Sequence, residues 1–124
     1  MSTVRVVVDA SSGLAPWRQV QDQIIRLISR GALAPGTRLP PIRQLAGDLG
    51  LASGTIARAY RELEAAGWVR TARARGTVVA ETAERSDPAA LLRAAAAEFV
   101  SAAKEIGADE ETAVSVVRKA YGSP

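Results

Sequence analysis

Apolar residues recur three and four positions apart in three stretches of the chain, which is the spacing of one helix face. The stretches cover residues 16–30, 42–49 and 53–66, and a glycine follows each of them. Residues 33–41, rich in Pro and Gly, predict a loop between the first two helices. The pattern therefore indicates three helices, of which the last two are separated by a turn of only three to four residues.

Runs rich in β-branched residues predict extended structure elsewhere in the chain. Residues 68–71 and 77–80 read as two strands joined by a turn at 74–76. Residues 4–9 are either an edge strand or an extended arm. Together with the helices, these runs predict a fold of class α+β that is mostly α.

The last third of the chain has the pattern of two further helices, of which the first begins at Pro88. Asp87 is a good N-cap for this helix, Gly107 ends it, and Asp109 caps the second helix. The two apolar stripes consist of Leu92, Ala95, Phe99, Ala102 and Ile106, and then of Val114, Val117 and Tyr121. Two short helices cannot bury both stripes alone, so each stripe needs a partner.

Composition narrows the chemistry that the chain can perform. It has 124 residues with neither Cys nor His, which excludes disulfides, thiolate metal sites and the commonest catalytic base. Paired acids facing a cleft and a glycine-rich phosphate loop are missing too, so we expect no enzyme and no cofactor. No apolar run approaches the roughly 18 residues of a membrane span, and we expect a cytoplasmic protein without a membrane partner.

The net charge of +3 is an average over two unlike halves. Residues 17–80 contain ten Arg and four acidic residues, a balance of +6, whereas residues 81–124 contain five basic and eight acidic ones, a balance of −3. Such asymmetry suggests that residues 17–80 bind a polyanion and that residues 81–124 have a different function. The alternative is that the basic residues are simply solvated surface.

The third predicted helix has two distinct faces. Its inward stripe consists of Ile56, Ala59, Tyr60 and Leu63, and its opposite face of Gly54, Ala57, Arg58 and Arg61. Small side chains beside arginines let a helix lie close to an anionic surface. Two helices joined by a tight turn describe a helix-turn-helix whose second helix enters the DNA major groove. An ordinary helical hairpin in a bundle would show the same periodicity.

The predicted hairpin after this helix favours a winged helix over a simple bundle. Its tip concentrates Arg73 and Arg75, and a basic hairpin there is a wing that reaches the minor groove or the phosphate backbone. The expected organisation is an N-terminal arm or strand (1–14), a winged helix-turn-helix DNA-binding domain (15–82), a linker (83–87) and a C-terminal helical dimerisation element (88–122).

The stretch "GALAPGTRLPPIRQLAGDLGLASGTIARAYRELEAAGWVRTARARGTVVA" resembles the GntR family of bacterial transcription regulators. It has the family's succession of Gly, Leu-Pro, Arg-x-Leu-Ala, Thr, Leu-Glu-x-x-Gly and Gly-Thr, and the resemblance covers residues 16–80. The "AYRELEAAG" segment and the short C-terminal part resemble the YtrA subfamily, whose members lack a large effector domain and are often encoded beside transporter genes.

The resemblance also implies roles for individual residues. Arg43 would contact DNA from the start of the second helix, Thr55 matches the threonine of the family's recognition helix, and residues 73–76 match the wing tip. The chain departs from the family pattern with Ser53 and Ala57 in place of common arginines, with Pro41 in place of a capping Ser, and with Ala74 in place of the first glycine of the wing.

A division of labour among the basic residues follows as a hypothesis. The residues expected to act mainly on phosphates are Arg38, Arg61, Arg73 and Arg75. Gly54 on the helix face and Gly76 at the wing tip belong to the same expected DNA-binding surface. Ser53, Thr55 and Arg58 would reach base edges, and Arg43 would serve either role. The alternative for Arg58 and Arg61 is an ion pair within the helix, with Glu62 and Glu64 respectively.

The C-terminal stripes either fold back onto the winged domain or pair with the same element of a second chain. We favour a homodimer, because two-fold symmetry suits a palindromic operator, with Leu92, Ala95, Phe99, Ala102, Ile106, Val117 and Tyr121 in the interface. The arm at 4–9 would add to it. An effector would lodge between subunits, since the C-terminal part is too short to wrap a pocket of about 300 Å³. The acids at 109–111 are more typical of a helix start than of a metal site.

The sequence therefore predicts a transcriptional regulator that binds double-stranded operator DNA, with repression implied by the family resemblance. A winged-helix module that binds protein or RNA is the alternative, since a fold does not fix a function. A protein-binding version would expose apolar anchors where this chain has arginines.

Overall fold

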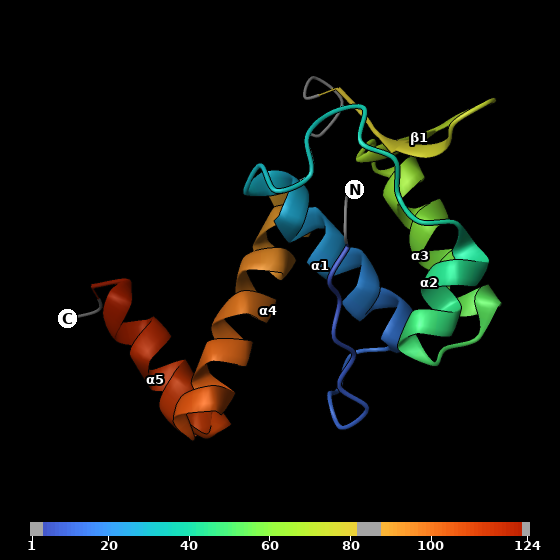
Figure 1. The fold of residues 1–124 in the computed structure, drawn as a ribbon. Helices are drawn as coiled ribbons and strands as arrows, with labels where there is room; N and C mark the ends of the chain where they lie inside the picture. The colour runs from blue at the N-terminus through green and yellow to red at the C-terminus, as the bar shows by residue number, and fades with distance from the viewer. Residues whose placement is uncertain (1–3, 82–87, 123–124) are drawn as a thin grey trace. The chain divides into compact units, whose positions relative to one another are not determined.

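The protein is described by a computed structural model of residues 4–81 and 88–122, which form two compact units divided after Ala94. The elements are α1 (Pro16–Ser29), α2 (Ile42–Leu49), α3 (Ser53–Ala65), β1 (Val69–Ala72), β2 (Gly76–Val79), α4 (Pro88–Ile106) and α5 (Glu110–Ala120) (Figure 1). The mostly helical fold with a small antiparallel hairpin confirms the predicted class. The predicted cap Asp87 and the linker 83–87 lie outside the described residues.

The core of the first unit forms where α1 crosses α3 (Figure 1). The inward stripe predicted for α3 is buried throughout, and Trp68 is 2% exposed at the start of the hairpin. The fully buried side chains include Val20, Ile24, Ile25, Leu39, Leu45, Ile56 and Leu63. Burying these apolar side chains is the main term that holds the three helices together.

β1 begins and ends one residue later than the sequence predicted, and β2 begins and ends one residue earlier. They pair antiparallel, with Val69 opposite Val79 and Ala72 opposite Gly76, and the amide of Ala80 bonds the Trp68 carbonyl beyond the ladder. The ladder therefore continues almost to the tip, and only residues 73–75 form the turn between the strands.

The N-terminal residues 4–9 are extended but join no strand of the sheet. Val4 and Val6 are buried in the core of the first unit. Two glutamines of α1 bond their backbone: Gln23 Nε2 donates to the Val7 carbonyl at 2.6 Å and Gln23 Oε1 accepts from the Val7 amide at 3.0 Å, while Gln19 does the same for Asp9. These amides satisfy backbone groups that a neighbouring strand would otherwise bond.

The first turns of α4 belong to the first unit. Ala94 is buried in its core, and Arg93 forms an ion pair with Asp22 of α1, with 3.5 Å between Nε and Oδ1. Asp22 is 1% exposed, and neither carboxylate oxygen has a hydrogen-bond partner among the described residues. Burial raises the pKa of Asp22, and the positive charges of Arg93 and Arg18 oppose that rise only in part.

Asp22→Asn is expected to become less destabilising as the pH rises from 4 to 7. A raised pKa in the folded state means that Asp22 contributes most stability below its unfolded pKa and loses it as pH rises through the folded value. Asparagine keeps the volume and never ionises. Urea unfolding of the wild type and Asp22→Asn at pH 4, 5.5 and 7 measures the difference in the free energy of unfolding. Asp48→Asn removes an exposed carboxylate of α2 and is the control. A difference that grows with pH would contradict the expectation.

The second unit consists of the rest of α4 followed by α5. Gly107, with φ +89°, ends α4, and the amide of Ala108 bonds the Ala103 carbonyl. Asp109 caps α5 as predicted, because its Oδ1 accepts from the Thr112 amide at 2.8 Å. This hydrogen bond lowers the pKa of Asp109, so the capping carboxylate is ionised at neutral pH.

Candidate nucleic-acid interface

A three-residue turn, residues 50–52, connects α2 to α3 and completes the helix-turn-helix. Gly50 adopts φ +68°, a left-handed conformation that glycine reaches without a Cβ clash. The amide of Leu51 then bonds the Ala46 carbonyl at 2.9 Å, which ends α2 sharply. Neither Pro41 nor Ala52 provides a side-chain cap, so no capping side chain occupies the N-terminal ends of α2 and α3.

The exposed face of α3 carries the residues predicted to meet DNA. Ser53, Gly54, Arg58 and Arg61 are exposed and Thr55 is half-buried. Gly54 has open space around it, since a Cβ built there meets nothing within 4 Å. Small residues at the N-terminal end of α3 therefore leave room for a groove wall or a phosphate.

The arginines of α3 do not make the helix ion pairs that the sequence left open as an alternative. The guanidinium of Arg58 lies over the ring of Trp17, with 4.2 Å between its carbon and the ring centroid. Glu64 accepts hydrogen bonds from the amide and the hydroxyl of Thr71, at 3.2 and 3.4 Å. Glu64 thus ties α3 to the first strand of the hairpin.

Residues 36–41 link the second strand of the hairpin, β2, to helix α3. This segment runs antiparallel to β2, with a bridge between Arg38 and Val78 and bonds of 2.8 Å from the Leu39 amide to the Thr77 carbonyl and from the Val79 amide to the Thr37 carbonyl. The Tyr60 hydroxyl of α3 donates to the Pro40 carbonyl at 2.6 Å. Burial raises the pKa of Tyr60 well above its usual range, so the phenol remains a donor.

The hairpin forms a wing whose tip is basic. Arg73 and Arg75 are both exposed, and Arg75 Nη2 donates to the Gly36 carbonyl at 3.3 Å. Gly76 has φ +73°, whereas Ala74 does not adopt a positive φ, so only the retained glycine of the wing takes the left-handed conformation. A Cβ on Gly76 would lie 3.7 Å from Arg38 Nε, which places Arg38 beside the wing.

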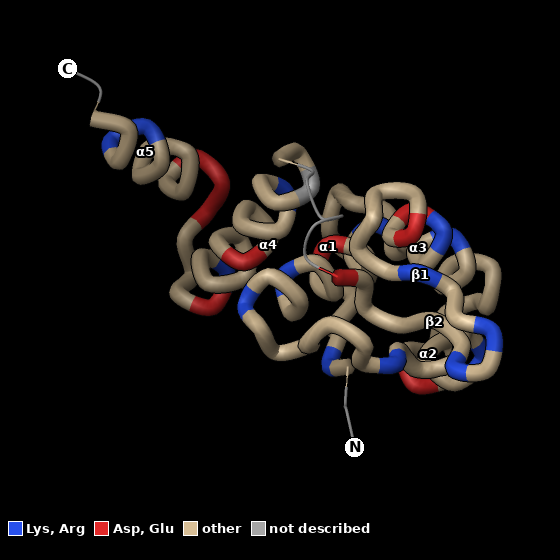
Figure 2. The backbone as a smooth tube through the Cα atoms, turned by 90° about the horizontal axis from the view of Figure 1, so that it is seen from above, with Lys and Arg blue, Asp and Glu red and all other residues tan. Residues whose placement is uncertain are grey.

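Basic residues gather on α3, on β1 and around the end of the wing in the first unit, as Figure 2 shows. The structure brings Arg38, Arg73, Arg75 and Gly76 together at the wing, and Ser53, Gly54, Arg58 and Arg61 along one helix. Arg43 is exposed at the start of α2. The arrangement is suited to a nucleic-acid duplex, whose phosphate backbone could contact α3 and the wing at the same time.

Sequence reasoning missed three residues that position this surface: Trp17, Tyr60 and Pro40. In the sequence, Trp17 lies within the helical pattern of residues 16–30, and Tyr60 was predicted only as part of the inward stripe of the third helix. The apolar body of each side chain does pack against the core. Their polar or π contacts join segments more than 15 residues apart, and no local periodicity reports such pairs.

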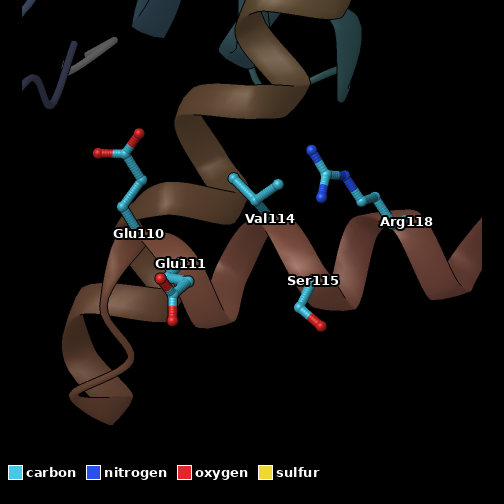
Figure 3. A pocket seen from close by; sticks show the side chains of 5 residues that line it. All are labelled: Glu110, Glu111, Val114, Ser115 and Arg118. Atoms are coloured by element: carbon cyan, nitrogen blue, oxygen red, sulfur yellow. The ribbon is translucent and has the colours of Figure 1, made fainter.

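All seven side chains predicted for the dimer interface are exposed in the single chain: Leu92, Ala95, Phe99, Ala102, Ile106, Val117 and Tyr121. An open hollow lies along α5, lined by Glu110, Glu111, Val114, Ser115 and Arg118 (Figure 3). No helix in the described ranges is long and apolar enough to cross a membrane. In the same ranges no group of three or more Asp or Glu side chains is arranged to hold a metal ion.

Residues 16–79 match the bacterial regulatory proteins of the gntR family, a match that covers α1 to β2. The chain belongs to the GntR family. Its relatives include the HTH-type transcriptional regulator Rv1152 of Mycobacterium tuberculosis, which is 44% identical over 108 residues and is matched over 86% of either chain. This GntR chain is therefore a transcriptional regulator with a winged helix-turn-helix.

Two relatives bear out the YtrA-like character of this GntR regulator. The HTH-type transcriptional repressor YtrA of Bacillus subtilis is 34% identical over 64% of this chain and 61% of its own length. The solved structure of YtrA from Sulfolobus acidocaldarius is 31% identical, with a TM-score of 0.61 over 80% of this chain and 99% of its own.

A solved DNA complex also resembles this GntR regulator. The DNA-binding domain of AraR in complex with operator ORE1 is 25% identical, with a TM-score of 0.52 over 61% of this chain and 93% of its own. The resemblance therefore extends to a domain that has been solved on operator DNA.

Proposed function

We propose that the protein is a homodimeric repressor that binds a two-fold-symmetric operator, with α3 in the major groove and the wing on the minor groove or the phosphate backbone. The observation that carries the proposal is the linked basic surface of α3 and the wing. The segment 36–41 bonds to both β2 and Tyr60, so hydrogen bonds link the two elements that present the arginines. Preorganised contacts of this kind cost little ordering on binding.

The proposed roles of the side chains follow their positions. Arg38, Arg73 and Arg75 at the wing, together with Arg61 on α3, would act on phosphates and supply sequence-independent affinity. Ser53, Thr55 and Arg58 would contact base edges, and an arginine paired with guanine discriminates by roughly 1 to 3 kcal/mol. Arg43, exposed at the start of α2, would contact either a phosphate or a base.

The C-terminal helices are proposed to supply the dimer. Leu92, Ile106 and Tyr121 are 69, 83 and 85% exposed, and large apolar side chains left so open in a small chain are typical of an interaction surface. The repressor named YtrA in Bacillus subtilis supports the proposed sign of regulation. The proposed target genes are the operon that encodes this chain and neighbouring transporter genes. Any effector would bind between subunits, where the hollow along α5 offers Arg118 and the carboxylates of Glu110 and Glu111.

Footprinting on the DNA upstream of the protein's own coding region tests the proposal directly. At near-physiological salt and with shuffled DNA as competitor, we expect protection of two symmetric half-sites about one helical turn apart. Uniform binding that shuffled DNA removes would contradict operator recognition, and would favour a winged helix that binds protein or RNA.

Arg73→Ala is expected to weaken binding to every duplex about 3- to 10-fold, with no change in the preferred sequence. Arg73 is exposed at the wing tip, and losing one phosphate contact lowers the slope of log K against log salt by about 0.9. Gel shifts at several salt concentrations measure both quantities. Arg5→Ala, exposed on the N-terminal segment, is the control for one lost charge. An unchanged slope would remove Arg73 from the interface.

A further inference from the structure

Trp17 and Arg58 form a contact between the first turn of α1 and the exposed face of α3. The Arg58 guanidinium lies over the Trp17 ring at 4.2 Å from the centroid, and Arg18 lies over the same ring at 5.1 Å. Trp17 is half-buried and packs against the core, which restricts the orientations open to its ring. Arg58 stands one turn after Gly54 and one turn before Arg61 on the face that carries the candidate DNA contacts.

An arginine stacked on an aromatic ring can still donate hydrogen bonds from the edge of its guanidinium. The attraction acts through the face of the planar guanidinium, whereas its N–H groups donate in the plane, along the edge. An arginine held in this way keeps a fork of donors that matches the O6 and N7 acceptors of guanine. A long side chain that is already ordered also loses less rotamer freedom when it binds.

We propose that Trp17 is a positioning residue for base recognition: it holds Arg58 against its ring before and during DNA binding, so that the edge of the guanidinium reaches a guanine in the major groove. The inference rests on the proposed DNA-binding function. It assigns to α1 a part in specificity, although α1 need not contact a base itself. The nearby Arg18 is further from the ring and does not lie on α3.

A purely structural contact would behave differently. If the pair only joined α1 to α3, removing the ring would lower stability and weaken binding to all duplexes alike. Positioning predicts instead a loss confined to the selected sequence. It also predicts that the effects of Trp17 and Arg58 substitutions are not additive, because both remove the same contact with DNA.

The test begins with duplexes selected from a randomised pool by the wild-type full chain. Arg58→Ala is expected to lose a guanine from the selected consensus, and Trp17→Leu, which keeps an apolar filler, to lose the same guanine. Arg58→Ala should bind the selected duplex at least about tenfold more weakly, because the guanine contact itself is lost. Trp17→Leu should bind it up to about tenfold more weakly, the factor that corresponds to fixing a long side chain. Trp17→Leu, which keeps every charge, should bind shuffled duplexes nearly as the wild type does. The double variant should bind the selected duplex no worse than Arg58→Ala does.

Two further variants separate positioning from loss of structure. Trp17→Phe keeps an aromatic face and should restore most of the selectivity. Arg18→Ala removes the more distant guanidinium and should leave the selected guanine unchanged. Thermal unfolding of all variants identifies any that are destabilised, and a Trp17→Leu that loses affinity for every duplex in proportion to its stability would overturn the proposal.

Tryptophan fluorescence tests whether the stack persists on DNA. Trp68 is 2% exposed, so acrylamide quenching reports mainly Trp17. Arg58→Ala should increase quenching in the free protein, and selected DNA should leave wild-type quenching unchanged or lower. An increase on DNA binding would mean that Arg58 leaves the ring, which overturns the proposal. A wild type that selects no consensus would overturn both the proposed function and this inference, whereas a consensus that Trp17→Leu leaves intact would overturn the inference alone.

Discussion

Val117→Asp is expected to raise the dissociation constant of the dimer at least about 100-fold and to reduce operator affinity by a similar factor. Val117 is exposed in the single chain, so the substitution does not open a cavity in its core. In a symmetric dimer the carboxylate would be buried twice, without a partner, in an apolar seam with Phe99 and Tyr121. A monomer would then hold only one half-site.

Val116→Asp is the matched control for this substitution. It places the same charge on the same helix, but the side chain points about 100° away from the stripe of Val114, Val117 and Tyr121. Sedimentation equilibrium measures the dimer, and gel shifts on full and half operators measure the binding. A dimeric Val117→Asp protein would rule out α5 as part of the interface.

Gly54→Glu is expected to leave the fold intact and to reduce affinity for all duplex DNA at least about 100-fold. A Cβ at Gly54 meets nothing within 4 Å, and glutamate in the first turn of a helix is favourable by both propensity and dipole, so stability should stay equal or rise by up to about 1 kcal/mol. The long carboxylate would, however, stand between α3 and the groove and repel phosphates.

Gly13→Glu adds the same side chain at another open position, in the turn before α1, and is expected to bind DNA as the wild type does. Thermal unfolding and fluorescence anisotropy with labelled duplexes measure the two properties on the same samples. Full DNA affinity in a folded Gly54→Glu protein would show that the N-terminal end of α3 does not approach DNA.

Local patterns were sufficient for the helices because each one begins and ends for local reasons. Pro at the first turn begins α1, Gly50 closes α2 in a left-handed conformation, and Asp109 caps α5. The strand boundaries were less well predicted, since they depend on which residues pair across the wing. The side chains of the candidate interface were predicted by position, but their contacts were not.

Periodicity, glycine stops and motif spacing are properties of neighbouring residues. They were therefore enough to predict the five helices of the described residues, the winged helix-turn-helix, the basic charge of residues 17–80 and the GntR family. Three contacts could be found only in the folded chain: residues 36–41 pair with β2, Tyr60 donates to the Pro40 carbonyl, and Arg58 stacks on Trp17. These contacts join segments up to about 40 residues apart. They form only when α1, α3, residues 36–41 and the hairpin pack together, and a local sequence pattern does not record that packing.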